Sequence, residues 1–223
     1  MHPRHVTDDA PSPHAQPRNR RILIARLGFV LSVSGIIVCL ALAVYFSSKN
    51  RSAMQDVIEQ VNRNFSLWEG VTAPDLTVTT IDGKTIRLSD LKGKRVVLDV
   101  WATWCPACLQ QMPGLVKLYD KTKRDDLVIL GISREDSKTL DDFVRKNRIN
   151  YPIASVSDLP APYSLDIILP TTYFIDRHGI IQSITIGYSN DAELAARALM
   201  SDYQGPPKPI PTNSIAILTN ASR

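Results

Sequence analysis

The chain has 223 residues, of which 44% are hydrophobic, and its formal net charge is +4. This length supports one packed domain with appendages but not two large domains. Most of the surplus positive charge comes from five arginines within residues 1–26, and no basic stripe with interleaved aromatic residues follows. We therefore expect no nucleic-acid partner.

The first element in chain order is an apolar run, residues 27–46, which contains no charged residue. A helix of this length covers ~30 Å, the thickness of the hydrocarbon core of a bilayer. The arginines before the run place residues 1–26 in the cytoplasm as a basic tail, by the positive-inside rule. We therefore expect a single-pass anchor in the inner (cytoplasmic) membrane, with the rest of the chain in the periplasm or another extracytoplasmic space.

A cleaved secretory signal peptide is the alternative to this anchor. Ala41-Leu42-Ala43 fits an A-x-A cleavage site, although the apolar run continues beyond it and the region before it is long. Both alternatives export the remainder of the chain. Cys39 lies inside the run, where a cysteine is usually a small packing residue, and we assign it no function.

Residues 47–70 have only weak helical periodicity and are predicted to form a tether. The folded domain is predicted over residues 71–204. It opens with a β-hairpin whose strands, residues 76–81 and 84–88, are joined by a two-residue type I′ turn at Asp82-Gly83.

The rest of the domain is predicted to alternate strands and helices. In chain order these are a buried strand (95–101), a helix from Cys105 to about residue 122 with Pro113 inside it, a buried strand (127–132), a helix capped by Ser137 (137–147), a short extended segment (152–154), a hairpin (172–176 and 180–187) and a helix capped by Asn190. This order predicts an α/β fold with a mixed central sheet and helices on both faces. Residues 205–223 are Pro-rich and are predicted to be an extended, poorly ordered tail.

The sequence Cys105-Pro106-Ala107-Cys108 follows the first buried strand directly and opens the first long helix. Two cysteines at this spacing can reach each other across one helical turn and close into a small disulfide. A cysteine at a helix start gains thiolate character from the unpaired amides there, so Cys105 is predicted to attack and Cys108 to resolve. The alternatives are a pair of ordinary core cysteines and half of a zinc site. His178 is the only other Cys or His after residue 47, so we expect no metal.

Several motifs resemble the thioredoxin superfamily and, within it, the TlpA/ResA-like membrane-anchored branch. They are residues 97–108 with Pro113 beyond them, the segments 73–76 and 91–94, and the segment 169–176. The resemblance covers about residues 71–202. It implies a thioredoxin-like fold and a thiol–disulfide oxidoreductase that uses a redox-active Cys105–Cys108 disulfide and no cofactor.

The resemblance also implies roles for residues outside the Cys pair. Pro170 matches the family's cis-proline, which lies against the cysteines, and it would bind substrate together with its neighbours Leu169 and Thr171. Asp99 matches the buried acid of thioredoxin and would take the proton of Cys108. Trp104 would shield the pair and offer an apolar contact to the substrate, or else serve only in packing.

Two residues depart from the TlpA/ResA pattern. That pattern places a proline second between the cysteines, whereas here Pro106 is first and Ala107 retains its N–H. The amides of Ala107 and Cys108 would then both point at the Cys105 sulfur, which would favour thiolate and make the pair more oxidising. Gln111 is the second departure, because members that act in cytochrome c maturation often carry Glu there.

The sequence therefore predicts a tethered enzyme that reduces disulfides of exported client proteins, such as apocytochrome c or a copper-site protein. A membrane electron donor of the thioredoxin-reducing type would keep it reduced. The alternatives are a disulfide oxidase or isomerase, a thiol peroxidase and a Cu(I)-binding carrier. A peroxidase usually has a Pro-x-x-x-Thr pattern before its cysteine, which is missing here, whereas two thiolates do suit Cu(I).

Overall fold

The computed structural model describes residues 59–122, 126–164 and 168–211, together with isolated positions between residues 39 and 55. The chain divides into two compact units, residues 1–57 and 58–223. The predicted basic tail, most of the predicted anchor and residues 212–223 lie outside the described residues. Within the described part, no helix is both long enough and apolar enough to cross a membrane.

The second unit contains the predicted β-hairpin, formed by β1 (Thr77–Thr79) and β2 (Thr85–Arg87), and a short 3₁₀ helix η1 (Leu88–Leu91) follows it. The prediction of a two-residue type I′ turn is wrong. Thr80 N–H donates to Lys84 O and Gly83 N–H donates to Thr80 O, both at 2.8 Å, so the loop has three residues. Gly83 has a φ of 81°, whereas Asp82 lacks the positive φ that a type I′ turn also requires.

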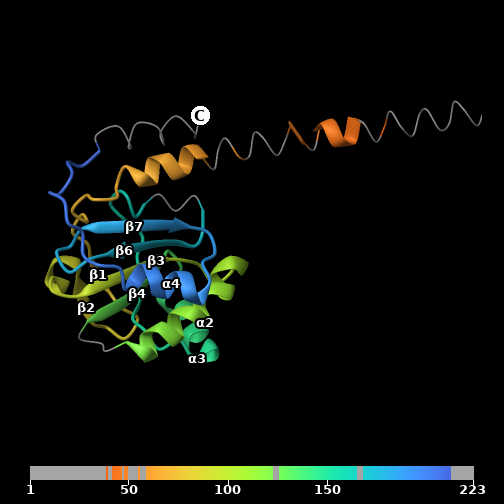
Figure 1. Ribbon diagram of the computed structural model, residues 1–223. Helices are drawn as coiled ribbons and strands as arrows, with labels where there is room; N and C mark the ends of the chain where they lie inside the picture. Colours follow the sequence, from red (N-terminus) through yellow and green to blue (C-terminus); the bar gives the residue numbers. More distant parts are fainter. Residues whose placement is uncertain are drawn as a thin grey trace, which may run out of the picture. The chain divides into compact units, whose positions relative to one another are not determined.

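A five-stranded mixed sheet forms the centre of the unit, as predicted. Its strands are β3 (Arg95–Val100), β4 (Leu127–Ser133), β5 (Ile153–Ser155), β6 (Thr171–Ile175) and β7 (Ile181–Ile186). They lie in the order β5-β4-β3-β6-β7. Strands β5, β4 and β3 run parallel to one another, β6 is antiparallel to β3, and β7 is antiparallel to β6. Figure 1 shows β7, β6, β3 and β4 stacked in this order. The central position of β3 explains why all but its first residue are buried.

The three long helices α2 (Pro106–Lys121), α3 (Ser137–Asn147) and α4 (Asp191–Ala198) pack on one face of the sheet. Right-handed crossovers explain this for α2 and α3, because the strands they connect advance in one direction across the sheet. Asn190 caps α4 as predicted, by accepting from the amides of Ala192 and Glu193. Asp136, rather than the predicted Ser137, caps α3 through Thr139 N–H at 2.9 Å.

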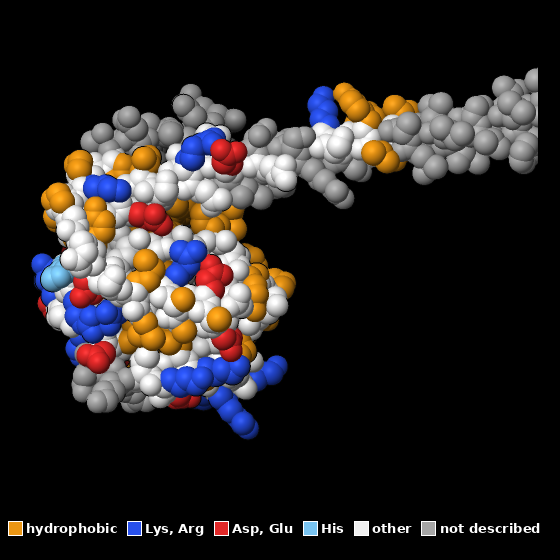
Figure 2. Space-filling model, viewed as in Figure 1, with side chains coloured by type: hydrophobic (Ala, Val, Ile, Leu, Met, Phe, Trp, Pro, Cys, Tyr) orange, Lys and Arg blue, Asp and Glu red, His pale blue; other side chains and the backbone are white. Residues whose placement is uncertain are grey.

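Charges of both signs lie next to one another on the face of the folded unit shown in Figure 2. An exposed ion pair links α2 to α4, where Lys117 Nζ lies 2.9 Å from Asp191 Oδ2. Both side chains are exposed, so the pair contributes little to stability. The described part of this face presents no extended field of one charge.

The opposite face of the sheet is covered by the hairpin and by residues that the sequence analysis assigned to the tether. Residues 59–66 are helical, and Phe65 and Trp68 are buried with Tyr173 of β6 in the same apolar cluster. The packed region thus begins earlier than the expected Val71. Helices do lie on both faces, but among the residues that the structure describes the helices on this side are this segment and η1.

The Pro-rich segment after α4 is extended, as expected, but its backbone is paired up to Lys208. Lys208 N–H donates to Gly70 O at 2.8 Å, and Tyr203 N–H donates to Asp176 Oδ2 at 2.9 Å. This differs from the expected poorly ordered tail over the part of residues 205–223 that the structure describes. The reason is that the segment forms hydrogen bonds with Gly70 and Asp176, which are distant in the sequence, and no local sequence pattern predicts such contacts.

Candidate active site

The Cys pair lies where β3 ends and α2 begins. Cys105 and Cys108 form a disulfide with a Cα–Cα distance of 5.3 Å. Cys105 is the N-cap of α2, and its Sγ accepts from Cys108 N–H at 3.1 Å. Pro106 occupies the first helical position, where its missing N–H costs no hydrogen bond. Local backbone physics therefore places one sulfur at the helix N-terminus and the other inside the first turn.

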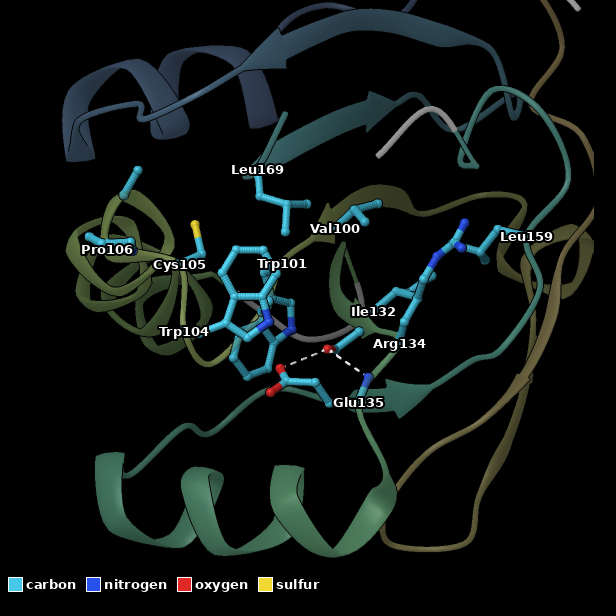
Figure 3. A pocket seen from close by; sticks show the side chains of 13 residues that line it. Val100, Trp101, Trp104, Cys105, Pro106, Ile132, Arg134, Glu135, Leu159 and Leu169 are labelled. Carbon is cyan, nitrogen blue, oxygen red and sulfur yellow. Dashed lines mark hydrogen bonds between the residues drawn. The ribbon is translucent and has the colours of Figure 1, made fainter. Parts of the chain in front are cut away.

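An open, mostly apolar pocket adjoins the disulfide. Cys105, Trp104 and Leu169 line one end of the pocket. Figure 3 shows the side chains of Trp104 and Leu169 next to each other beside the Cys105 sulfur. Trp104 is 71% exposed, so most of its indole is available to another molecule. Val100 and Ile132 form apolar walls, and the other end is lined by Arg134, Glu135 and Leu159.

The remaining predicted substrate-binding residues lie next to this pocket but do not line it. The Leu169–Pro170 peptide bond is cis, as the resemblance implied, and a second cis bond joins Ala161 to Pro162. Pro170 is buried. Thr171 is also buried, and its hydroxyl donates to Ile168 O at 2.6 Å. Of the four predicted binding residues, only Trp104 and Leu169 face the space beside the disulfide.

Asp99 is buried near the end of β3, six residues before Cys105, with 1% of its surface exposed. Its Oδ1 accepts two hydrogen bonds, from Thr172 Oγ1 at 2.7 Å and from Gln111 Nε2 at 3.1 Å. Burial raises the pKa of this carboxyl to about 7, although the two hydrogen bonds act in the opposite direction. A group with this pKa can take up and release a proton near neutral pH.

Gln111 is a buried residue of the site that the sequence analysis treated only as a departure from a family pattern. It lies one turn after Cys108 on α2 and is 1% exposed. Its Nε2 donates to Asp99 Oδ1 and to Thr172 Oγ1, and its Oε1 accepts from Ser189 N–H at 2.8 Å. One amide thus connects the acid on β3 with β6 and with the loop before α4.

Replacing Gln111 with glutamate is expected to destabilise the fold above pH 7 and to raise the pKa of Asp99. The change removes two donated bonds and places a second carboxyl group beside the first, and two such groups do not ionise together readily. We expect a loss of about 1–3 kcal/mol in unfolding free energy at pH 8 and a smaller loss at pH 5. Chemical denaturation at both pH values measures this, with the exposed neighbour Gln110→Glu as the matched control. Equal losses in the two variants would contradict the role of the Gln111 amide.

Glu135 is a second residue that the sequence analysis missed. Its carboxylate accepts from Thr103 N–H at 2.7 Å and from Thr103 Oγ1 at 2.5 Å, and this fixes the segment that carries Trp104. Ser133 Oγ donates to the same carboxylate at 3.2 Å. The signal was present, because Glu135 follows β4 and the carboxyl ends of the parallel strands β3 and β4 meet at one edge of the sheet.

Comparison with known proteins agrees with this geometry. Residues 70–184, which include both cysteines and Asp99, match the AhpC/TSA family. The chain is 33% identical over 137 residues to the thioredoxin-like protein YneN of Bacillus subtilis, an alignment that covers 59% of this chain and 79% of YneN. It is 34% identical over 128 residues to the thiol-disulfide oxidoreductase ResA of Bacillus cereus, which covers 56% of this chain and 73% of ResA.

Solved structures share the same fold. A protein from Bacteroides thetaiotaomicron, described as a candidate protein disulfide isomerase, aligns with a TM-score of 0.51 and 32% identity over 57% of this chain and 84% of its own. DsbF of MTB aligns with a TM-score of 0.51 and 24% identity over 57% of this chain and 97% of its own. The chain belongs to the AhpC/TSA family, has a thioredoxin-like fold and is a thiol–disulfide oxidoreductase.

Proposed function

We propose that this protein is a membrane-tethered, extracytoplasmic oxidoreductase that reduces disulfides of exported client proteins. The observation that carries the proposal is the Cys105–Cys108 disulfide beside an open apolar pocket. Trp104 stands exposed at its edge, so an unfolded client segment that presents a disulfide would find an apolar surface next to the sulfur it must react with.

The reaction proceeds through two thiol–disulfide exchanges. In the reduced enzyme, the Cys105 thiolate attacks one sulfur of the client disulfide, and the other client sulfur leaves as a thiolate. Asp99 accepts the proton of the Cys108 thiol, and the new thiolate attacks Cys105 Sγ in the mixed disulfide. The second client thiolate leaves, so two electrons pass to the client and the enzyme is left with its disulfide. No bound cofactor takes part.

The location and the partners follow from the apolar run at residues 27–46 and from the resemblance to the TlpA/ResA branch. We infer an anchor in the inner membrane, a cytoplasmic N-terminus and a membrane electron donor of the thioredoxin-reducing type. The clients would be apocytochrome c or copper-site proteins. The mass of the protein extracted from membranes tests the anchor, because a mature N-terminus at Val44 would overturn it.

The redox state of the Cys pair in living cells tests the direction of electron flow. Free thiols are trapped by alkylation, and the modified protein is separated by its mass. A reductase holds Cys105 and Cys108 mostly as thiols, and their dependence on a membrane donor appears when that donor is removed. A pair found mostly as a disulfide in growing cells would contradict the proposal and favour the second candidate.

The second candidate is a disulfide oxidase or isomerase, and the amides at the helix start favour it. Cys108 N–H already donates to Cys105 Sγ, and in this disulfide form the Ala107 N–H has no hydrogen bond within the described residues. The sequence predicts that both amides point at the sulfur, and in the structure one of them, Cys108 N–H, donates to it. The Ala107 amide remains free to stabilise a Cys105 thiolate, which would raise the reduction potential.

Exchanging the two spacer residues, as Pro106→Ala with Ala107→Pro, is expected to lower the reduction potential by about 30–60 mV. The exchange deletes the Ala107 N–H, and a hydrogen bond to a charged acceptor contributes about 1.5–3 kcal/mol. Equilibration with glutathione measures the potential, and Pro106→Ala alone is the control that retains the Ala107 N–H. The unchanged protein should lie above about −270 mV, the value of thioredoxin. An unchanged or higher potential after the exchange would remove the physical basis of the second candidate.

A further inference from the structure

Three polar side chains, two from the end of β3 and the residue after it and one from just before β5, are buried around Gly131 of β4. Asp99 and Trp101 are each 1% exposed, and Tyr151, just before β5, is 4% exposed. Neither the Tyr151 hydroxyl nor Trp101 Nε1 has a hydrogen-bond partner in the part of the chain that the structure describes. A buried donor without a partner is costly, so two of them at one place require an explanation.

The backbone register brings these groups to one place. Asp99 is the partner of Gly131 in the parallel pairing of β3 with β4, and Trp101 follows Asp99 by two residues, so both side chains point to the same face as a side chain at position 131 would. A Cβ atom on Gly131 would clash with Ile153 Cδ1 and would lie 2.9 Å from Trp101 Nε1 and 3.3 Å from Tyr151 Cε2. The missing side chain therefore allows the Ile153 methyl group, the indole N–H and the phenol ring to approach one another here.

The charge of Asp99 acts on Tyr151. Burial raises the pKa of the Tyr151 hydroxyl well above its ordinary value, and the Asp99 carboxylate raises it further. The hydroxyl is thus a permanent donor at physiological pH. The residues that the neighbouring elements place against Asp99 are Gln111 from α2, Thr172 from β6 and Gly131 from β4, and none of the three carries a charge. Charged groups farther out, which line the surface pocket beside Tyr151, are Asp82, Lys84 and Asp141.

We propose that Asp99, Trp101 and Tyr151 bind one buried water molecule beside Gly131, and that Tyr151 is thereby a positioning residue for Asp99. A buried water typically makes about three hydrogen bonds to polar groups that lack other partners. Here the water accepts from the indole N–H and from the phenol O–H, and it donates to the carboxylate. All three protein groups are satisfied, and the charged form of Asp99 gains a donor.

This inference deepens the proposed function, on which it rests for the role of Asp99 as the base for Cys108. By stabilising the carboxylate, the water would hold the pKa of Asp99 near neutrality against the effect of burial. Asp99 could then accept the proton of Cys108 at the pH at which the enzyme works. Without the water, the pKa of Asp99 would be higher and the resolving step would need a higher pH.

The variant Tyr151→Phe tests the site, because it deletes the hydroxyl and keeps the ring. The experiment uses the full chain in its disulfide form, in which the cysteines do not titrate, and follows the Asp99 carboxyl carbon by NMR as the pH is raised. We expect the pKa of Asp99 to rise by about one unit, since one donor to the charged form is lost. The matched control is Tyr163→Phe, because the Tyr163 hydroxyl donates to Pro74 O at 2.9 Å within the apolar cluster on the other face of the sheet. It should leave the titration of Asp99 unchanged.

A second measurement detects the water itself. Magnetisation transfer between a long-lived water and the Trp101 indole proton is expected in the unchanged protein and should be lost in Tyr151→Phe. An unchanged Asp99 titration in Tyr151→Phe, or no long-lived water at Trp101 in the unchanged protein, would overturn the inference. Both readouts are independent of catalysis, so they remain valid if Asp99 has no role in the reaction. The proposed function would fail separately, as an unchanged rate of client release in an Asp99 variant.

Discussion

With Cys108 replaced by serine, the protein is expected to accumulate as a covalent complex with its clients. Cys105 can still attack a client disulfide from the start of α2, but no thiol three residues later remains to release the client. Steady-state reduction of a disulfide substrate should fall at least about a thousandfold, because the mixed disulfide is then resolved only by external thiols. Non-reducing electrophoresis of cell extracts detects the complexes, and mass spectrometry identifies the clients.

The companion variant Cys105→Ser separates attack from resolution. It removes the attacking sulfur, so we expect a similar loss of turnover but no trapped clients. Cys39→Ser is the matched control, because Cys39 is a free cysteine in the other unit of the chain, and its removal should change neither readout. Clients trapped equally well by Cys105→Ser would show that Cys108 attacks, and the assignment of the two sulfurs would have to be reversed.

The elements around the Cys pair are predictable because local backbone chemistry determines them. The run of Val and Leu in β3 favours a buried strand, and the helix begins where Cys105 provides a cap and Pro106 provides the fixed φ of a first turn. Asn190 fixes the start of α4 in the same way. In each case the residues that determine the structure lie within a few positions of one another.

The elements that differ from the prediction depend on contacts between distant segments. The sequence around Trp68 has no clear hydrophobic periodicity. Trp68 is buried because it packs in the apolar cluster on the sheet face that carries Tyr173. Lys208 pairs with Gly70 although 137 residues separate them along the chain. The hairpin turn shows the same limit on a small scale, because Asp82-Gly83 suits a type I′ turn and also a three-residue loop.

In the candidate site, too, locally determined residues can be predicted from the sequence and contacts between distant segments cannot. The cysteines and Asp99 can be found from sequence, although the roles given to them stay predictions. The partners of Asp99 cannot, because the bond to Thr172 joins β3 to β6 across 73 positions and the Gln111 amide fits only once α2 is packed on the sheet. The importance of Gly131 likewise cannot be predicted from sequence, because it depends on the strand register that pairs Gly131 with Asp99.

Replacing Asp99 with asparagine is expected to slow release of the client by about a hundredfold to ten-thousandfold. The amide oxygen can still accept from Thr172 and Gln111, so the geometry is retained while the base is removed. The loss should be largest above pH 7, where the carboxyl of the unchanged protein is ionised, and small at pH 5, where it is mostly protonated. Single-turnover kinetics of client release as a function of pH measure this. A loss that does not vary with pH would show that Asp99 acts through packing instead.

The same substitution is expected to stabilise the fold, by an amount that depends on pH. Because the pKa of Asp99 is about 7 in the folded protein and 3.8 is its ordinary value, folding favours the protonated form. This stability is complete below pH 4 and is lost as the pH rises through 7. The difference in pKa corresponds to about 4 kcal/mol, which Asp99→Asn should recover above pH 8 and not at pH 4. Denaturation at both pH values measures it.

Asp136→Asn serves as the contrasting control for this stability measurement. The Asp136 carboxylate accepts hydrogen bonds from Thr139 at the start of α3, and these bonds lower its pKa, so its contribution to stability is lost as the pH falls. Asparagine caps a helix about as well as aspartate, so this variant should fold normally and release clients at the usual rate. A gain in stability that is equal at pH 4 and pH 8 in Asp99→Asn would mean that burial does not hold this acid near neutrality. The resolving thiol would then need another base, and no other carboxylate contacts Gln111 or Thr172 among the described residues.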